Sequence, residues 1–162
     1  MTEPFLGKAW TTYMGTLIRV LNISQGDVVE LGAGPFSTPL LHWVCKDMHR
    51  KLISLENNPE YFLFAKQFRS YFHSTIFVKD WDKIDSKTHR GLVFVDHRPE
   101  ARRPIEAIRF NNSAYYVVIH DTENEKYYSE VWKNFKYVYT WKGCRPWTSV
   151  VSNNKDLNFL TL

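Results

Sequence analysis

Two glycines and a carboxylate stand where strands are expected to end in the first third of the chain. Residues 28–31 form a short strand-like run, and Gly32-Ala33-Gly34 follows it directly. Glycines allow a tight turn and let a ligand approach where no Cβ intervenes. A second run ends in Glu56, whose carboxylate could accept both hydroxyls of a ribose. The pattern predicts a nucleoside site; a plain strand-to-helix turn with a solvated or helix-capping Glu56 is the alternative.

The residues around these glycines also bear on which nucleoside cofactor would bind. A nicotinamide fingerprint requires a third glycine, and Ser37 stands at that place. A dehydrogenase would usually need a second domain, for which the chain has no residues. Glu30, two residues before the first glycine, could meet the ammonium group of a methionine moiety. These features disfavour NAD and suggest a different adenosine cofactor.

Further polar residues follow two later strand-like runs. Asp96 and His97 end one run, and His120 and Asp121 end the next. Two carboxylates at neighbouring strand ends could converge on a divalent cation. His97 is the candidate general base because imidazole titrates near neutral pH; a hydrogen-bonded structural histidine is the alternative, and His120 could be a capping or core residue.

Three arginines, Arg98, Arg102 and Arg103, follow the Asp-His pair. They could bind an anionic substrate beside a cleft. The alternative interpretation is a solvated helix start, and the sequence favours it.

The elements that must position these residues alternate between strands and helices. Strand-like runs occupy residues 28–31, 52–55, 75–78, 92–95 and 116–119. Successive apolar residues are typical of strands covered on both faces, and alternation with helices predicts a parallel sheet. Residues 137–141 and 147–151 leave no room for a helix between them, so they predict a hairpin. We expect one α/β domain over residues 1–162: a Rossmann-like three-layer α/β/α sandwich with a seven-stranded, mostly parallel sheet and an antiparallel C-terminal hairpin strand.

The helices are expected from periodicity and caps. An apolar stripe predicts a helix over residues 5–21. Thr38 and Asn58 precede prolines and are expected to cap two further helices. Another helix is expected to begin near Glu123.

Composition limits the class of protein. The net charge of +4 is mild, so a nucleic-acid partner is not expected. Cys45 and Cys144 form no CxxC pair, which favours buried reduced thiols and a cytoplasmic protein. No signal peptide or membrane span is expected.

Three segments resemble the class I S-adenosylmethionine-dependent methyltransferases. Glu30-Leu31-Gly32-Ala33-Gly34 is similar to their glycine-rich motif. The segment Glu56-Asn57-Asn58-Pro59-Glu60-Tyr61 resembles the second-strand motif of the catechol O-methyltransferase-like group. Val93-Phe94-Val95-Asp96-His97 is similar to the fourth-strand ending of that group. The resemblance covers essentially the whole chain.

The resemblance implies roles for the matching residues. Expected cofactor-binding residues are Glu30, Gly32, Ala33, Gly34, Ser37, Glu56, Asn57, Asp80, Trp81 and Asp96. Of these, Glu30, Gly32 and Gly34 would line the methionine end, Glu56 would hold the ribose, and Asp80 or Trp81 would contact the adenine, with core packing as the alternative for Trp81. Expected catalytic residues are Asp96, His97 and Asp121.

This sequence departs from the catechol-type pattern at two places. Thr122 stands where those relatives complete a metal site with Asn, and Arg98-Pro99 stands where they carry Lys. No metal ligand is therefore assigned, and bound magnesium stays an open alternative. The chain lacks the Asn-Pro-Pro-Tyr and Asp-Pro-Pro-Tyr sequences, which favours O-methylation of a small-molecule or glycan-type acceptor. A catalytically inactive cofactor-binding module or partner subunit, an RNA methyltransferase and a homodimer are the alternatives.

Overall fold

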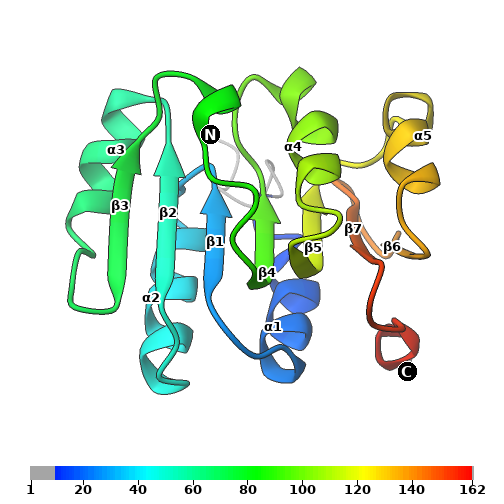
Figure 1. Ribbon diagram of the computed structural model, residues 1–162, viewed down its shortest axis with the longest axis horizontal. Helices are drawn as coiled ribbons and strands as arrows, with labels where there is room; N and C mark the ends of the chain where they lie inside the picture. The colour runs from blue at the N-terminus through cyan, green and yellow to red at the C-terminus, as the bar shows by residue number, and fades with distance from the viewer. Residues whose placement is uncertain (1–9, 162) are drawn as a thin grey trace, which may run out of the picture.

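The structure, a computed structural model, describes residues 10–161 and is built on one seven-stranded sheet. The strands are β1 (Val28–Leu31), β2 (Leu52–Glu56), β3 (His73–Phe77), β4 (Arg90–Val95), β5 (Ala114–His120), β6 (Tyr137–Trp141) and β7 (Thr148–Ser152). Their spatial order is β3-β2-β1-β4-β5-β7-β6 (Figure 1). Only β7 is antiparallel to its two neighbours. The predicted mostly parallel sheet and its closing hairpin are confirmed.

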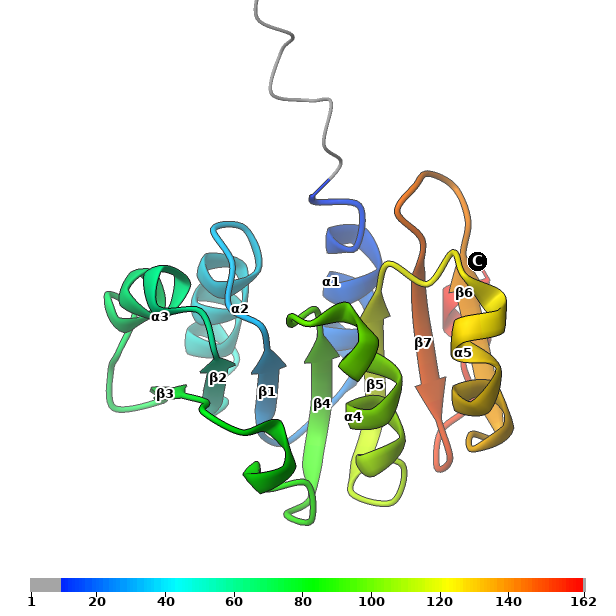
Figure 2. The ribbon, with the colours of Figure 1, turned by 90° about the horizontal axis from the view of Figure 1, so that it is seen from above.

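Helices cover both faces of the sheet. The helices α1 (Met14–Ile23), α2 (Ser37–Asp47) and α3 (Pro59–Lys66) lie on one face, and α4 (Arg103–Arg109) and α5 (Glu125–Lys133) lie on the other (Figure 2). This is the predicted three-layer α/β/α sandwich.

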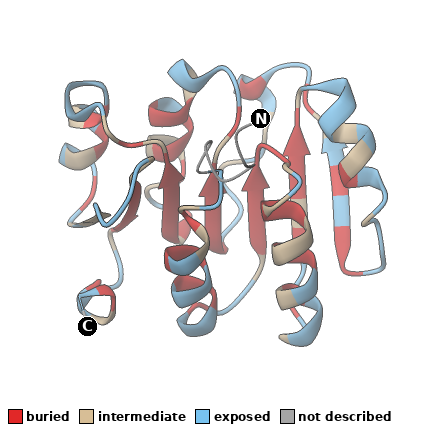
Figure 3. Ribbon diagram, turned by 180° about the vertical axis from the view of Figure 1, so that it is seen from behind, coloured by how far each residue is buried: buried red, intermediate tan, exposed pale blue. Residues whose placement is uncertain are grey.

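The central strands are buried on both faces, as Figure 3 shows. In β4, Leu92 and Phe94 pack in the core beneath α1 and α2, while Val93 and Val95 pack in the core beneath α4 and α5. Side chains alternate across a strand, so an unbroken apolar run fills both cores at once. β4 and β5 are therefore held firmly between the two helical layers. The polar residues of the candidate site lie at the carboxyl ends of these two strands.

One part of the sheet has helices on one face only. The connection from β3 to β4 contains the three-residue 3-10 helix η2 (Trp81–Lys83). The faces of β2 and β3 opposite α2 and α3 border a hollow of about 580 Å³ that Ile53, Leu55 and Ile76 help to line. Ile76 is 48% exposed. Figure 2 shows α4 and α5 lying beyond this region.

Some predicted helix boundaries are wrong. Residues 5–9 of the predicted first helix lie outside the described residues, residues 10–13 form a turn, and α1 starts at Met14. Thr38 is not a cap, because α2 already begins at Ser37. Asn58 is confirmed as the cap of α3, since its side chain accepts from the backbone N–H groups of Glu60 and Tyr61. Helix α5 begins two residues later than expected, after the cap Asn124.

Both cysteines are free thiols, but only one is buried. Cys45 lies in the core, whereas Cys144 is exposed in the β6–β7 loop, so the expectation of a second buried thiol is wrong. Within residues 10–161, no helix combines the length and apolar character needed to cross a membrane.

Candidate active site

A cleft of about 520 Å³ opens at the carboxyl ends of β1, β2, β4 and β5. Its lining comprises Trp10, Tyr13, residues 32–37, residues 56–59, Tyr61, residues 96–98, Glu100, Arg103, His120, Asp121 and Pro146. Ligands of open α/β sheets bind beyond the carboxyl ends of strands, where the strand order reverses. The volume lies in the range of small-molecule sites.

The loop after β1 packs against the backbone of the loop after β4. Gly32 has φ +94°, and a Cβ placed on it would lie 2.5 Å from the Cα of His97. This conformation and this close approach both require glycine. Gly32 therefore holds the floor of the cleft together through backbone contact.

Glu56 joins the loop after β1 to the loop after β2 at one side of the cleft. Its Oε2 accepts the backbone N–H of Ala33 at 2.7 Å, and its Oε1 accepts the backbone N–H of Asn58 at 2.6 Å. Burial raises the pKa of this carboxyl, and the hydrogen bonds from Asn58 and Ala33 oppose the rise. Because each carboxylate oxygen has a further lone pair, Glu56 could still accept from a ligand.

Asn57 adds an unused acceptor to the same wall. Its side-chain Oδ1 is buried and makes no hydrogen bond within the described structure. A buried polar atom without a partner is costly, and a ligand hydroxyl or amine in the cleft could supply the missing donor.

Glu30 lies behind the cleft rather than in its lining. Its side chain is fully buried; it accepts a hydrogen bond from the hydroxyl of Ser54 at 2.5 Å and hydrogen bonds from Thr38 at 3.0 Å. Thr38 in turn accepts the N–H of Gly34 at 3.1 Å. The expected direct contact between Glu30 and a methionine ammonium group is thus corrected: Glu30 reaches the glycine loop through Thr38, while Ser37 lines the cleft itself.

The buried Glu30 should make stability depend on pH. Burial raises the pKa of its carboxyl from 4.5 to about 7, against hydrogen bonds from Ser37, Ser54 and Thr38. The folded protein then keeps a proton that the unfolded chain releases, so stability falls as pH rises through this window, by about 3 kcal/mol in total. Glu30→Gln, neutral at every pH, should gain by that amount relative to the parent between pH 4.5 and 7.

Urea unfolding of the parent and Glu30→Gln at several pH values measures this effect. The quantity to compare is the difference between the free energies of unfolding of the two proteins at each pH. Burial lowers the pKa of His73 to about 4, so His73 makes both proteins more stable as the pH rises over an overlapping range, and the difference removes this effect. Free energies of unfolding that run parallel for the two proteins from pH 4.5 to 7 would contradict the prediction.

Asp80 and Trp81 lie outside the cleft lining. Asp80 is exposed and caps η2 by accepting the N–H of Asp82. Trp81 is buried, and its ring lies against that of His97 with centroids 4.1 Å apart. The expected adenine contacts of both residues are therefore not supported by their positions; Trp81 has the alternative role, core packing.

His97 is corrected from a candidate base to a buried residue of the core. Its side chain has no exposed surface, and its Nε2 lies 3.4 Å from Oε2 of Glu106. Burial lowers its pKa, and Glu106 opposes the fall. With its ring buried between Trp81 and Glu106, His97 is not placed as a general base in this structure.

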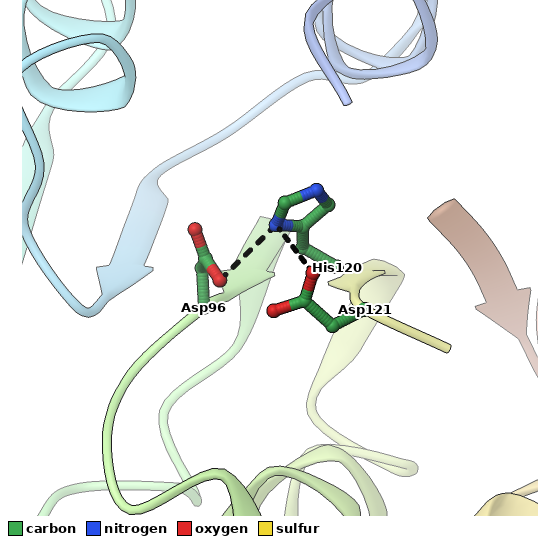
Figure 4. A group of neighbouring side chains, drawn as sticks. All are labelled: Asp96, His120 and Asp121. Atoms are coloured by element: carbon green, nitrogen blue, oxygen red, sulfur yellow. Dashed lines mark hydrogen bonds and ion pairs between the residues drawn. The ribbon is translucent and has the colours of Figure 1, made fainter. Parts of the chain in front are cut away.

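Asp96, His120 and Asp121 come together at the far end of the cleft (Figure 4). The Nδ1 of His120 lies 3.3 Å from Oδ1 of Asp96 and 3.4 Å from Oδ1 of Asp121. Arg103, at the start of α4, forms ion pairs with both carboxylates. The predicted convergence of Asp96 and Asp121 is present, and the sequence missed their arginine partner.

His120 also contacts the chain ahead of α1. Its Nε2 lies 3.0 Å from Oγ1 of Thr12, and that hydroxyl donates to the carbonyl oxygen of Pro146 at 2.8 Å. A hydroxyl has one proton, so Thr12 must accept from the Nε2–H of His120. On the other side of the ring, Nδ1 faces the carboxylates of Asp96 and Asp121. His120 therefore helps to hold the two carboxylates in position.

The three arginines after Asp96 lie in different surroundings. Arg103 is 3% exposed, which excludes the solvated helix start for this residue. Arg102 pairs with Asp82 and Glu106. Arg98 is exposed at the cleft and lies 3.8 Å from Glu100.

The comparisons with known proteins concern the fold. The sequence matches no protein-family model and no curated protein sequence. Among solved structures, precorrin-6y C5,15-methyltransferase from Geobacter metallireducens aligns with a TM-score of 0.57 at 14% identity, over 85% of this chain and 86% of that one. The N-methyltransferase NodS from Bradyrhizobium japonicum aligns with a TM-score of 0.61 at 11% identity, over 89% and 95%. The chain has the class I methyltransferase fold.

A third methyltransferase-fold neighbour holds a cofactor product. TrmK from M. capricolum, in complex with S-adenosylhomocysteine, aligns with a TM-score of 0.57 at 12% identity, over 87% of this chain and 69% of that one. Because the similar structures include enzymes described by different methyl transfers, the shared fold does not select the catechol-type group.

Proposed function

We propose that this protein is an S-adenosylmethionine-dependent methyltransferase that methylates a hydroxyl of a small-molecule or glycan-type acceptor. The observation that carries the proposal is the cleft itself. One wall is the glycine loop tied to Glu56, and the far end holds Asp96 and Asp121. A methyltransferase needs these two ends, one for its nucleoside and one for its acceptor.

The residues present fit the cofactor. Residues 32–34 and Ser37 would hold the methionine end, and Glu56 with the unpartnered Oδ1 of Asn57 would accept hydroxyl or amine protons of the adenosine. The bound cofactor supplies a methyl group on a sulfonium. The chain's own contribution is alignment, exclusion of water and removal of the acceptor's proton.

Asp96 and Asp121 are the candidate proton acceptors at the far end of the cleft. Their side chains are 23% and 33% exposed, whereas the side chain of His97 is inaccessible. Trp10 and Phe36 give the cleft aromatic surface. Aromatic surface beside a carboxylate suits a hydroxyl-bearing organic acceptor.

The cleft gives little support to RNA as acceptor. Of the arginines in its lining, Arg103 is buried in ion pairs and Arg98 is exposed. An RNA site would need several unpaired cations along a groove.

Calorimetry with S-adenosylmethionine and with NAD tests the cofactor, and a screen of hydroxyl-bearing acceptors tests the reaction. We expect the protein to bind S-adenosylmethionine but not NAD. We also expect methyl transfer to at least one hydroxyl-bearing acceptor. Preferred binding of NAD would refute the proposal. Tight binding of S-adenosylmethionine without turnover across broad acceptor panels would instead favour a cofactor-binding module.

A further inference from the structure

The acceptor end of the cleft contains the ligands of a metal site. Asp96, His120 and Asp121 each offer one ligand atom, and these atoms lie within 4.8 Å of one another. Magnesium prefers carboxylate oxygens, so within residues 10–161 this group is the candidate site for a divalent cation.

A guanidinium already forms ion pairs with both carboxylates of that group. The side chain of Arg103 is 4% exposed. Its Nη2 lies 2.9 Å from Oδ1 of Asp96, and its Nη1 donates to Oδ2 of Asp121.

Three backbone carbonyls fix the same guanidinium in place. Nε of Arg103 donates to the oxygen of His97 at 2.9 Å, Nη1 to that of His120 at 3.4 Å, and Nη2 to that of Asp96 at 3.2 Å. The five contacts come from residues 96–97, directly after β4, and from residues 120–121 at the end of β5, so Arg103 joins both strand ends to α4. Such a side chain cannot move aside without losing several buried hydrogen bonds.

The carboxylate oxygens are correspondingly engaged. Three of the four contact a nitrogen of His120 or Arg103: Oδ1 of Asp96 and both oxygens of Asp121. A divalent ion here would have to displace these contacts and would face the fixed positive charge of Arg103. The residues present do not fit a bound magnesium ion.

We infer that Arg103 takes the place of a divalent cation in this protein. It holds Asp96 and Asp121 in position at the acceptor end, as a metal ion would, and makes the site independent of metal. The inference rests on the proposed function only because it calls the end of the cleft with Asp96 and Asp121 the acceptor end. Metal binding can be measured without cofactor, so the two can fail separately.

The test is a Mn²⁺ titration followed by electron paramagnetic resonance of the free ion, without S-adenosylmethionine. We expect the parent to bind no Mn²⁺ at this site at millimolar concentration. Arg103→Ala should bind about one Mn²⁺, at least tenfold more tightly than the parent, and its unfolding temperature should rise with added Mn²⁺. Adding Asp121→Asn to Arg103→Ala should abolish that binding.

Arg98→Ala is the matched control, because it removes an arginine charge from the same cleft without touching either carboxylate. It should behave as the parent does. The inference is overturned if the parent binds one Mn²⁺ that Asp121→Asn removes, or if folded Arg103→Ala binds Mn²⁺ no better than the parent. If Arg103→Ala does not fold, Mn²⁺ binding by the parent and by Asp121→Asn still tests whether the parent has a metal site at these residues.

Discussion

Replacing Gly32 by valine should both destabilise the fold and remove cofactor binding. Gly32 has φ +94°, a conformation that β-branched residues avoid, and the new Cβ would lie 2.5 Å from a backbone carbon of His97. Backbone strain and overpacking together should lower the free energy of unfolding by about 3 kcal/mol or more. The clash can be relieved only if the loops after β1 and β4 move apart. Because both loops line the cleft, the affinity for S-adenosylmethionine should fall by at least about 100-fold.

Gly15→Val provides the control for this variant. Gly15 lies in α1, where a Cβ would meet nothing within 4 Å. Urea unfolding and calorimetry should show the control close to the parent in both quantities. If Gly32→Val unfolds at the parent's midpoint and binds the cofactor as tightly, the close packing of the two loops does not shape the site.

Removing the charge of Glu56 should weaken S-adenosylmethionine binding by about 100-fold. Both oxygens accept backbone N–H groups, from Ala33 and Asn58, and both remain able to accept ribose hydroxyls. Hydrogen bonds to a charged group contribute about 1.5–3 kcal/mol each, and the lower end of this range for two bonds, about 3 kcal/mol, corresponds to roughly this factor. Glu56→Gln also turns an NH₂ group toward one backbone donor, so some stability should be lost as well.

Glu60→Gln makes the same chemical change four residues away on an exposed position of α3. Calorimetry should find its affinity unchanged. A Glu56→Gln protein that is folded and binds S-adenosylmethionine like the Glu60→Gln control would show that this carboxylate only ties the loops and does not meet the ligand.

The sheet could be predicted from sequence because the signal is local. Strands covered on both faces must be apolar at successive positions, as in residues 92–95, and the turn signals around them fixed their ends to within a few residues. An apolar stripe does not reveal where the chain turns before it enters a helix, so the stripe over residues 5–21 predicts a start ahead of Met14. A hydroxyl before proline is a common cap, but the hydroxyl of Thr38 instead contacts Glu30.

The sequence indicates which residues lie near the candidate site. It indicates less well which of their side chains point into the cleft. Strand alternation, applied to β1, puts Glu30 on the same face as Val28, beneath α2, and this signal could have shown that it is buried. His97 and Arg103 lie beyond strand ends, where direction depends on the path of the loop. No local pattern reveals that an arginine after an irregular segment turns back onto two strand ends, so its ion pairs with Asp96 and Asp121 could not be predicted.

β2 and β3 are covered by helices on one face only, whereas β4 and β5 are covered on both. The two parts of the sheet should therefore differ in the free energy needed to separate their strands. Amide hydrogens of β2 and β3 should exchange with deuterium sooner than those of β4 and β5, because separating strands covered on one face exposes less apolar surface. Glu56 is the last residue of β2 in the more labile half, and Asp96 directly follows β4 in the more protected half. A nucleoside bound between them would connect the two, so slower deuterium uptake along β3 would report that the distant cleft is filled.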